Sequence, residues 1–253
     1  MSVVAKLEPI WQELKALART FFYTPEKNCL LCEKSSAEGE FCLDCLEEYF
    51  YPELPRCVNC GKLIPKEQIK CTDCQVGKGP RGLDKVIALG YYGGAWREFI
   101  QNVKYKAQPY QLKKISSFLG NFAISHLPPP HYLIPVPLHQ ERLAERGFNQ
   151  AEEIASLLQW ECGIPLYSPN PLQRLENTPS QVGLGREERL QNLKGTIGFL
   201  PGEAEKLKGA KVWLIDDITT TGATLEHCAY ELKKIGVKKV FGLVLAAGLE
   251  KRK

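Results

Sequence analysis

The stretch KVWLIDDITTTGATL, from Lys211 to Leu225, is the most informative part of this chain. Four apolar residues lead into the adjacent aspartates Asp216 and Asp217, and a loop of threonines and one glycine precedes a helical pattern. A buried strand that ends in two acids and turns into a helix N-terminus suits a ribose phosphate. Loop N–H groups, hydroxyls and the helix dipole can hold the phosphate. The carboxylates can bind ribose hydroxyls or a hydrated magnesium ion.

Strand and helix patterns alternate on both sides of this stretch. Strands are predicted at Asp84–Tyr92, 131–136, Lys211–Asp216 and Lys239–Leu245, with short ones near Leu172–Leu175 and Thr196–Phe199; helices are predicted at Ala95–Tyr105, Gln111–His126, Gln150–Cys162 and Ala223–Ile235. Such alternation predicts an α/β fold, a parallel sheet flanked by helices. Ligands of these folds sit beyond the carboxyl ends of the strands, where the acidic pair falls.

The acidic pair and its loop have two interpretations. Adjacent carboxylates repel each other, so a cation or hydroxyl groups should compensate them. Because neighbouring side chains of a strand point to opposite faces, we expect the strand to end at the pair. The alternative is a solvated turn with an aspartate N-cap, but three β-branched threonines make a poor generic turn. Gly222 offers a positive φ, and no lysine follows it as in a Walker loop.

A second motif, PVPLHQERLAERGFNQ, follows the strand at 131–136 and carries Arg142 and Arg146. Guanidinium groups bind pyrophosphate bidentately, which makes both arginines candidate ligands. Their i to i+4 spacing also fits two solvated arginines on a helix. A third segment, Arg174–Phe199, is long, polar and typical of a flap that closes over a charged ligand. Arg186 and Arg189 would be its closing cations, and an exposed charged helix is the alternative.

A basic segment spans Lys78–Lys114, with eight Lys and Arg against two acidic side chains and with aromatic residues between them. Such a mixture could bind single-stranded nucleic acid by charge and stacking. The alternative is a solvated face above aromatic core residues. The whole chain has a formal net charge of only +4, which by itself does not indicate a polyanionic partner.

Eight of the ten cysteines form four C-x2-C knuckles: Cys29, Cys32, Cys42 and Cys45, then Cys57, Cys60, Cys71 and Cys74. Two knuckles supply a tetrahedral thiolate set, so the spacing predicts two structural zinc ions. Disulfides are the rival interpretation, and ligands could also interleave between knuckles. A catalytic zinc is not expected, because four thiolates leave no open position for water. Cys162 and Cys228 stand alone within helical patterns and are expected in the core.

The 253 residues, 44% hydrophobic and 25% charged, predict three parts. Residues 1–25 form an amphipathic helix, 26–80 a double zinc ribbon and 81–253 the α/β domain. The helix is expected to dock on the protein itself, with a membrane surface or a partner as alternatives. The sequence shows neither an 18-residue apolar run nor a signal-peptide pattern, so no membrane span and a cytoplasmic location are expected.

Taken in order, the motifs resemble the ComF family of competence proteins over almost the full length. The matching pieces are the four knuckles, YYGGAWREFIQNVKYK, PVPLHQERLAERGFNQ, the pattern Q-x2-L-x-R-x2-R-x2-N from Gln181 to Asn192, and LIDDITTTGATL. The family joins a double zinc ribbon to a type I phosphoribosyltransferase domain. One departure is Ile218 with Thr219, where many members have Val followed by Tyr, Met or Ser.

The resemblance implies a site for 5-phosphoribosyl 1-pyrophosphate (PRPP) and Mg2+. Asp216 and Asp217 would hold the ribose hydroxyls, and the region Val136–Arg146 would face the pyrophosphate. The 5′-phosphate would be wrapped by Thr219, Thr220, Thr221, Gly222, Ala223 and Thr224. Family members are associated with DNA uptake in the cytoplasm, which implies single-stranded DNA and competence or helicase proteins as partners.

Two functions remain open from the sequence. The first is an enzyme that transfers the phosphoribosyl group of PRPP to an unidentified acceptor, with Asp216, Asp217, Arg142 and Arg146 as its catalytic residues. It would stabilise the reaction by electrostatics, so the absence of an evident nucleophile is no objection. The second is a non-catalytic competence factor that senses PRPP or handles single-stranded DNA.

Overall fold

The computed structural model describes residues 27–36, 40–51, 54–106, 108–175, 195–200 and 202–250. The chain divides into two compact units, Met1–Leu43 and Asp44–Lys253. The predicted N-terminal helix and most of the predicted flap, with Arg186 and Arg189, lie outside the described residues.

Short elements build the cysteine-rich part. In the first unit β1 (Lys27–Asn28) pairs antiparallel with β2 (Ser35–Ser36). The three-residue helix α2 (Leu43–Cys45) spans the division between the units. A π-helical turn, η1 (Leu46–Phe50), and the short helix α3 (Thr72–Gln75) follow in the second unit.

A four-stranded parallel sheet organises the second unit. Its order is β3-β8-β7-β4, formed by β3 (Lys85–Tyr91), β8 (Lys239–Ala247), β7 (Lys211–Thr219) and β4 (Tyr132–Pro135). Separately, β5 (Leu172–Arg174) pairs antiparallel with β6 (Ile197–Phe199). The apolar run Val212–Ile215 is fully buried, because β7 lies between two strands and under helices on both faces.

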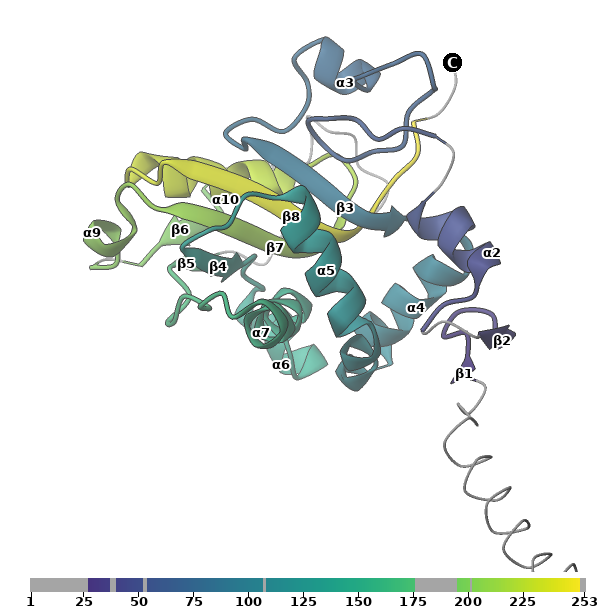
Figure 1. Cartoon of the computed structure of the whole chain (residues 1–253). Coiled ribbons are helices and arrows are strands. Elements are labelled where there is room, and N and C mark those ends of the chain that lie inside the picture. The colour runs from purple at the N-terminus through teal and green to yellow at the C-terminus, as the bar shows by residue number, and fades with distance from the viewer. Residues whose placement is uncertain are drawn as a thin grey trace, which may run out of the picture. The chain divides into compact units, whose positions relative to one another are not determined.

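Helices cover both faces of this sheet. They are α4 (Gly94–Tyr105), the 3-10 helix η2 (Pro109–Ile115), α5 (Ser116–His126), α6 (Gln140–Arg146), α7 (Gln150–Cys162), α9 (Ala204–Leu207) and α10 (Ala223–Lys234). Figure 1 shows α10 on one face of the sheet and α5 and α7 on the other. The buried Trp96 indole N–H donates to the Leu245 carbonyl at 3.1 Å, which fixes α4 against the carboxyl end of β8.

The second cysteine cluster is built onto the edge of the sheet rather than tethered to it. The Val86 N–H donates to the Asn59 carbonyl at 3.1 Å, and Leu63 bridges to Leu249 just beyond β8. The segment between Arg56 and Leu63 therefore belongs to the same compact unit as the sheet.

The parallel sheet flanked by helices, predicted from the alternating pattern, is confirmed. The predicted helix at Gln111–His126 begins instead as the 3-10 helix η2, where the Ser116 hydroxyl donates to the Lys113 carbonyl at 2.9 Å. Cys228 is fully buried in the core, as expected. Among the described residues, no helix has the length and apolar character needed to cross a membrane.

Candidate functional site

The two central motifs leave the sheet side by side. β4 and β7 pair in parallel with Pro135 opposite Ile215, and the Val136 N–H donates to the Ile215 carbonyl at 2.8 Å. Because both chains run in the same direction, the residues after Pro135 and the acidic pair reach the same edge. The expectation that these motifs meet at one sheet edge is therefore confirmed.

The expectation that β7 ends at Asp216 is wrong. β8 continues to Ala247 and supplies partners as far as Thr219, so β7 includes both acids. Asp217 and Thr219 consequently share a buried face, whereas Asp216 lies on the other face and is half-buried. The two carboxylates thus differ in burial, although the charges of both act on Lys104.

Asp217 is paired with a lysine from α4. Its Oδ2 lies 2.6 Å from the Lys104 Nζ, and both side chains are largely shielded from water. Burial acts to lower the pKa of Lys104, but the charges of Asp217 and Asp216 outweigh it and raise that pKa. Lys104 is therefore a permanent cation that neutralises one of the two acids.

Among the described residues, no cation forms an ion pair with Asp216 like that between Lys104 and Asp217. Burial, together with the charge of Asp217, raises the pKa of Asp216 to about 8, while Lys104 acts in the opposite direction. The Asp217 N–H donates to Asp216 Oδ1 at 2.8 Å. Below that pH the carboxyl is protonated in the unliganded chain, so the site is poised to gain a cation or hydroxyl donors.

The threonine loop is short and its glycine is sterically required. Thr220, Thr221 and Gly222 connect β7 to α10, and Gly222 has a φ of +77° at the N-cap position. The Glu226 N–H donates to the Gly222 carbonyl at 2.9 Å, which starts the helix. A Cβ at Gly222 would lie 2.8 Å from the Pro80 Cβ, so this position excludes a side chain for space as well as for φ.

The predicted arginines have different surroundings. Burial lowers the pKa of Arg174, and the nearby positive charge of Arg142 lowers it further. The charges of Cys228 and Asp216 act in the opposite direction. Arg174 thus belongs to the neighbourhood of Asp216. The Arg146 Nη1 instead donates to Gln150 Oε1 at 3.3 Å, and its guanidinium lies over the Tyr105 ring, 5.4 Å from the centroid.

The start of α7 presents a buried donor beside these arginines. Asn149 caps the helix, because its Oδ1 accepts from the Ala151 N–H at 3.1 Å. Its Nδ2 donates to the Val136 carbonyl at 3.0 Å. Gln150 follows with its Nε2 buried, and no other described residue forms a hydrogen bond with it. A buried amide N–H that lacks an acceptor is costly, and an anionic ligand would supply one.

Sequence analysis missed Lys104, Arg174 and Gln150 as site residues. Lys104 was counted with the solvated cations of the basic segment. Its spacing gives a usable signal, because Trp96, Ile100 and Lys104 follow one another at four-residue intervals on the buried stripe of α4. A lysine on such a stripe needs a buried partner. Arg174 and Gln150 carry no comparable pattern.

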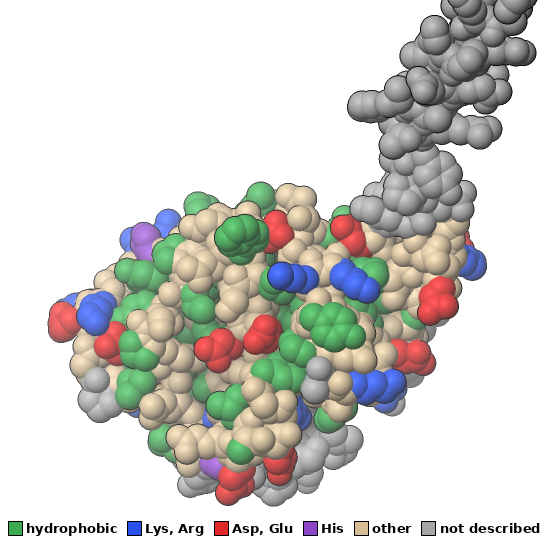
Figure 2. Space-filling view, turned by 90° about the horizontal axis from the view of Figure 1, so that it is seen from below, with side chains coloured by type: hydrophobic (Ala, Val, Ile, Leu, Met, Phe, Trp, Pro, Cys, Tyr) green, Lys and Arg blue, Asp and Glu red, His purple; other side chains and the backbone are tan. Residues whose placement is uncertain are grey.

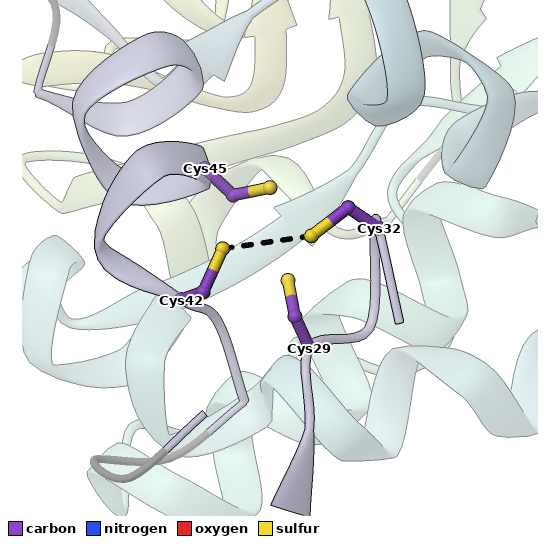
Figure 3. Close-up of side chains that lie close together, drawn as sticks. All are labelled: Cys29, Cys32, Cys42 and Cys45. Carbon is purple, nitrogen blue, oxygen red and sulfur yellow. Dashed lines mark hydrogen bonds between the residues drawn. The ribbon is translucent and has the colours of Figure 1, made fainter. Parts of the chain in front are cut away.

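The cysteines form two separate four-sulfur clusters in sequence order. The first holds Cys29, Cys32, Cys42 and Cys45, shown in Figure 3, and the second holds Cys57, Cys60, Cys71 and Cys74. Within each cluster the sulfur atoms lie within 4.8 Å of one another. All ten cysteines are free, so disulfides and interleaved ligand sets do not describe this arrangement.

Both clusters fit a tetrahedral zinc ion. Zn–S bonds of about 2.3 Å place the sulfurs of a tetrahedron about 3.8 Å apart. The Cys32–Cys42 and Cys60–Cys71 sulfur pairs are each 3.5 Å apart. Burial acts to raise the pKa of Cys29, but main-chain N–H groups around the sulfur lower it to about 6, which favours the thiolate that binds metal.

Comparisons with known proteins agree with this organisation. A double zinc ribbon domain model matches residues 19–75. Competence protein F of Haemophilus influenzae is 29% identical over 228 residues, which is 86% of this chain and 96% of that protein. DNA utilization protein YhgH of Salmonella typhi is 30% identical over 194 residues, 73% of this chain and 80% of that protein. Competence protein ComFC of Bacillus subtilis is 28% identical over 179 residues, 68% and 69% of the two chains.

Among solved structures, a purine phosphoribosyltransferase from Pyrococcus horikoshii Ot3 overlaps 55% of this chain and 73% of its own, with a TM-score of 0.33 and 19% identity. The parallel sheet flanked by helices and the N-terminal cysteine clusters define an α/β protein with a double zinc ribbon. The chain belongs to the ComF family, together with competence protein F, ComFC and YhgH.

The two acids should affect stability in opposite directions. Asp217→Asn leaves the largely buried Lys104 charge without its partner and is expected to lower the free energy of unfolding by about 3 kcal/mol. Because the folded pKa of Asp216 is raised from 3.8 to about 8, the wild type loses stability as the pH rises across that range. Asp216→Asn removes this loss, so its advantage should grow from pH 4 to pH 8.

Urea unfolding at several pH values, without added ligand or magnesium, measures both effects. The double variant Lys104→Met with Asp217→Asn should recover part of the stability lost in Asp217→Asn alone. Equal destabilisation by the two aspartate substitutions at every pH would contradict this account.

Zinc content follows from the two clusters. Purified, tag-free protein should contain two zinc ions per chain, and replacing one cysteine of either cluster by serine should reduce the content to one. Elemental analysis measures this directly. Fewer than one zinc per wild-type chain would rule out the assignment.

Proposed function

We propose that this protein binds PRPP with Mg2+ at the carboxyl edge of β7 and transfers its phosphoribosyl group to an acceptor. One observation carries the proposal: a half-buried, incompletely compensated acid, Asp216, stands beside Lys104, Arg174 and the loop that opens α10. A group held where it destabilises the unliganded chain is typical of a ligand site. The ligand must offer hydroxyls or a cation to the acid and anionic groups to the basic residues.

PRPP has these parts in the required order. We assign the ribose hydroxyls to Asp216 and Asp217, and the 5′-phosphate to the hydroxyls and amides of Thr219–Thr224 at the N-terminus of α10. The pyrophosphate would face Arg142 and Arg146, with Arg174 and the unsatisfied Gln150 amide as further donors.

Transfer would rely on electrostatics rather than on a nucleophile. As the bond from ribose C1 to pyrophosphate breaks, positive charge develops on the ribose and negative charge on the departing group. Asp216 and Asp217 would stabilise the first, and the guanidinium groups of Arg142 and Arg174 the second. The carboxylate oxygens fit Mg2+, which would neutralise charge on the pyrophosphate when bound.

PRPP affinity tests the assignment. The wild type should bind PRPP in the presence of Mg2+, and Asp216→Ala or Asp217→Ala should weaken binding by about 100-fold or more, because each removes a charged ligand contact. Isothermal titration calorimetry measures the affinity. Glu161→Gln is a matched control, since this carboxylate bonds to the Ser116 and Ser117 hydroxyls at the far end of α7.

Wild-type affinity in both alanine variants would disprove the assignment of the acids. Turnover is tested separately, by pyrophosphate release from PRPP in the presence of candidate amines and bases. Release that depends on an acceptor identifies an enzyme, whereas binding without release identifies a PRPP sensor.

A second candidate function is the handling of single-stranded DNA. The names of two relatives, competence protein F and DNA utilization protein YhgH, refer to competence and to DNA. Tyr105 is 68% exposed under the Arg146 guanidinium, and Arg97 lies 5.7 Å from the Tyr92 ring centroid at the other end of α4. An exposed ring with a cation above it, as at Tyr105, suits a stacked base, whereas Tyr92 is half-buried. By contrast, the face shown in Figure 2 mixes basic, acidic and hydrophobic side chains.

Tyr105→Ala should weaken binding of an oligo-dT strand several-fold, because one base loses its stacking partner. Fluorescence anisotropy at several salt concentrations measures this. Tyr230→Ala is a matched control, since Lys234 lies over that exposed ring on α10 at 5.5 Å. Equal losses in both variants, or binding that hardly responds to salt, would contradict the α4 surface as the contact.

A further inference from the structure

The segment Gly79–Asp84, here called the strap, joins the second cysteine cluster to β3 and runs along α10. Its contacts on α10 are Gly222, Glu226 and Ala229, spaced four and three residues apart, so they form one stripe of the helix. The stripe begins at the loop proposed to hold the 5′-phosphate. The strap therefore connects a metal centre to that loop within one compact unit.

At its first residue the strap touches a metal ligand. A Cβ added at Gly79 would lie 2.4 Å from the Cys74 Sγ, so the main chain passes directly against this sulfur and tolerates no side chain. The Lys78 N–H donates to the Asp73 carbonyl at 2.6 Å, which ties the preceding residue to α3. The position of Gly79 therefore depends on where Cys74 is held.

The next residue supports the loop. The ring of Pro80 packs on the Cα of Gly222, since a Cβ there would meet the proline Cβ at 2.8 Å and its Cγ at 2.9 Å. A proline ring is rigid and fixes its own φ, so its position follows from that of Gly79. Pro80 thereby limits the movement of Gly222, the residue whose positive φ starts α10.

The other end of the strap is anchored without any metal. Arg81 Nε lies 3.4 Å from Glu226 Oε1, and Gly82 packs on the Ala229 Cβ. Asp84 Oδ2 accepts from the Val240 N–H at 2.9 Å and from the Lys233 Nζ at 3.2 Å. Loss of metal would therefore release the Gly79–Pro80 end, which is the end that supports the loop.

We propose that metal in the second cluster orders the phosphate loop through the strap, with Pro80 as the positioning residue. The second cysteine cluster then has a role beyond stabilising its own ribbon. Its consequence for PRPP rests on the proposed function, whereas its consequence for loop order does not. Coupling of this kind is reciprocal, so a ligand in the loop should also raise the zinc affinity of this cluster.

Hydrogen exchange of the full chain tests the proposal without any ligand. The probe is the first turn of α10, beginning with the Glu226 N–H that donates to the Gly222 carbonyl. Cys74→Ser, which removes one zinc, and Pro80→Gly, which retains both, should each speed exchange there by about tenfold. Two matched variants should not: Cys32→Ser, which removes the zinc of the first cluster, and Pro65→Gly, a turn proline of the same ribbon.

Wild-type exchange in Pro80→Gly, with two zinc ions bound, would overturn the proposal even if Cys74→Ser fails to fold. Equal acceleration in the Cys32 and Cys74 variants would also overturn it, because the effect would then be general. If the wild type binds PRPP, Pro80→Gly should weaken binding by about fivefold or more. If the wild type does not bind PRPP while exchange changes as expected, the proposed function is contradicted. The proposal that metal orders the loop through the strap is then still supported.

Discussion

The ion pair between Lys104 and Asp217 is the constraint on which the candidate site depends. Two adjacent acids near the end of a buried strand repel each other. The Lys104 ammonium, 2.6 Å from the Asp217 carboxylate, neutralises the charge of one of them. The remaining acid, Asp216, stays protonated near neutral pH because burial and the charge of Asp217 raise its pKa more than Lys104 lowers it. The helix that carries Lys104 is itself fixed by the bond from Trp96 to the Leu245 carbonyl. The hydrogen bond of Trp96 in the core thus helps to position Lys104 beside Asp217.

Parallel strand pairing is the second constraint. It brings the end of β4 beside the acids of β7, so motifs about eighty residues apart in sequence share one edge. The second cysteine cluster reaches the same region by another route, through Gly79 and Pro80 against Gly222. In this arrangement a cluster that takes no part in the chemistry is joined through two consecutive residues to the loop where a phosphate would bind.

Much of this organisation was predictable from local pattern. Gln150–Cys162 and the short strands near Leu172 and Ile197 follow from periodicity and glycine boundaries, and the cysteine spacing predicted both clusters. The end of β7 was not predictable, because it depends on the length of the neighbouring strand β8. The role of Lys104 was not predictable for a related reason. A charged residue on a buried stripe indicates that it has a partner, but only the tertiary fold identifies this partner as Asp217. Assignment of Arg174 likewise required the fold.

We propose that the acids of β7 and the loop after it hold one ribose phosphate. A crystal structure of the protein with Mg2+ and PRPP tests it most directly. The account predicts the 5′-phosphate on the main-chain N–H groups from Thr220 to Ala223, the ribose hydroxyls on Asp216 and Asp217, and the pyrophosphate toward Arg142. Ligand density at another place, with the Lys104–Asp217 pair and the loop unchanged, would contradict it.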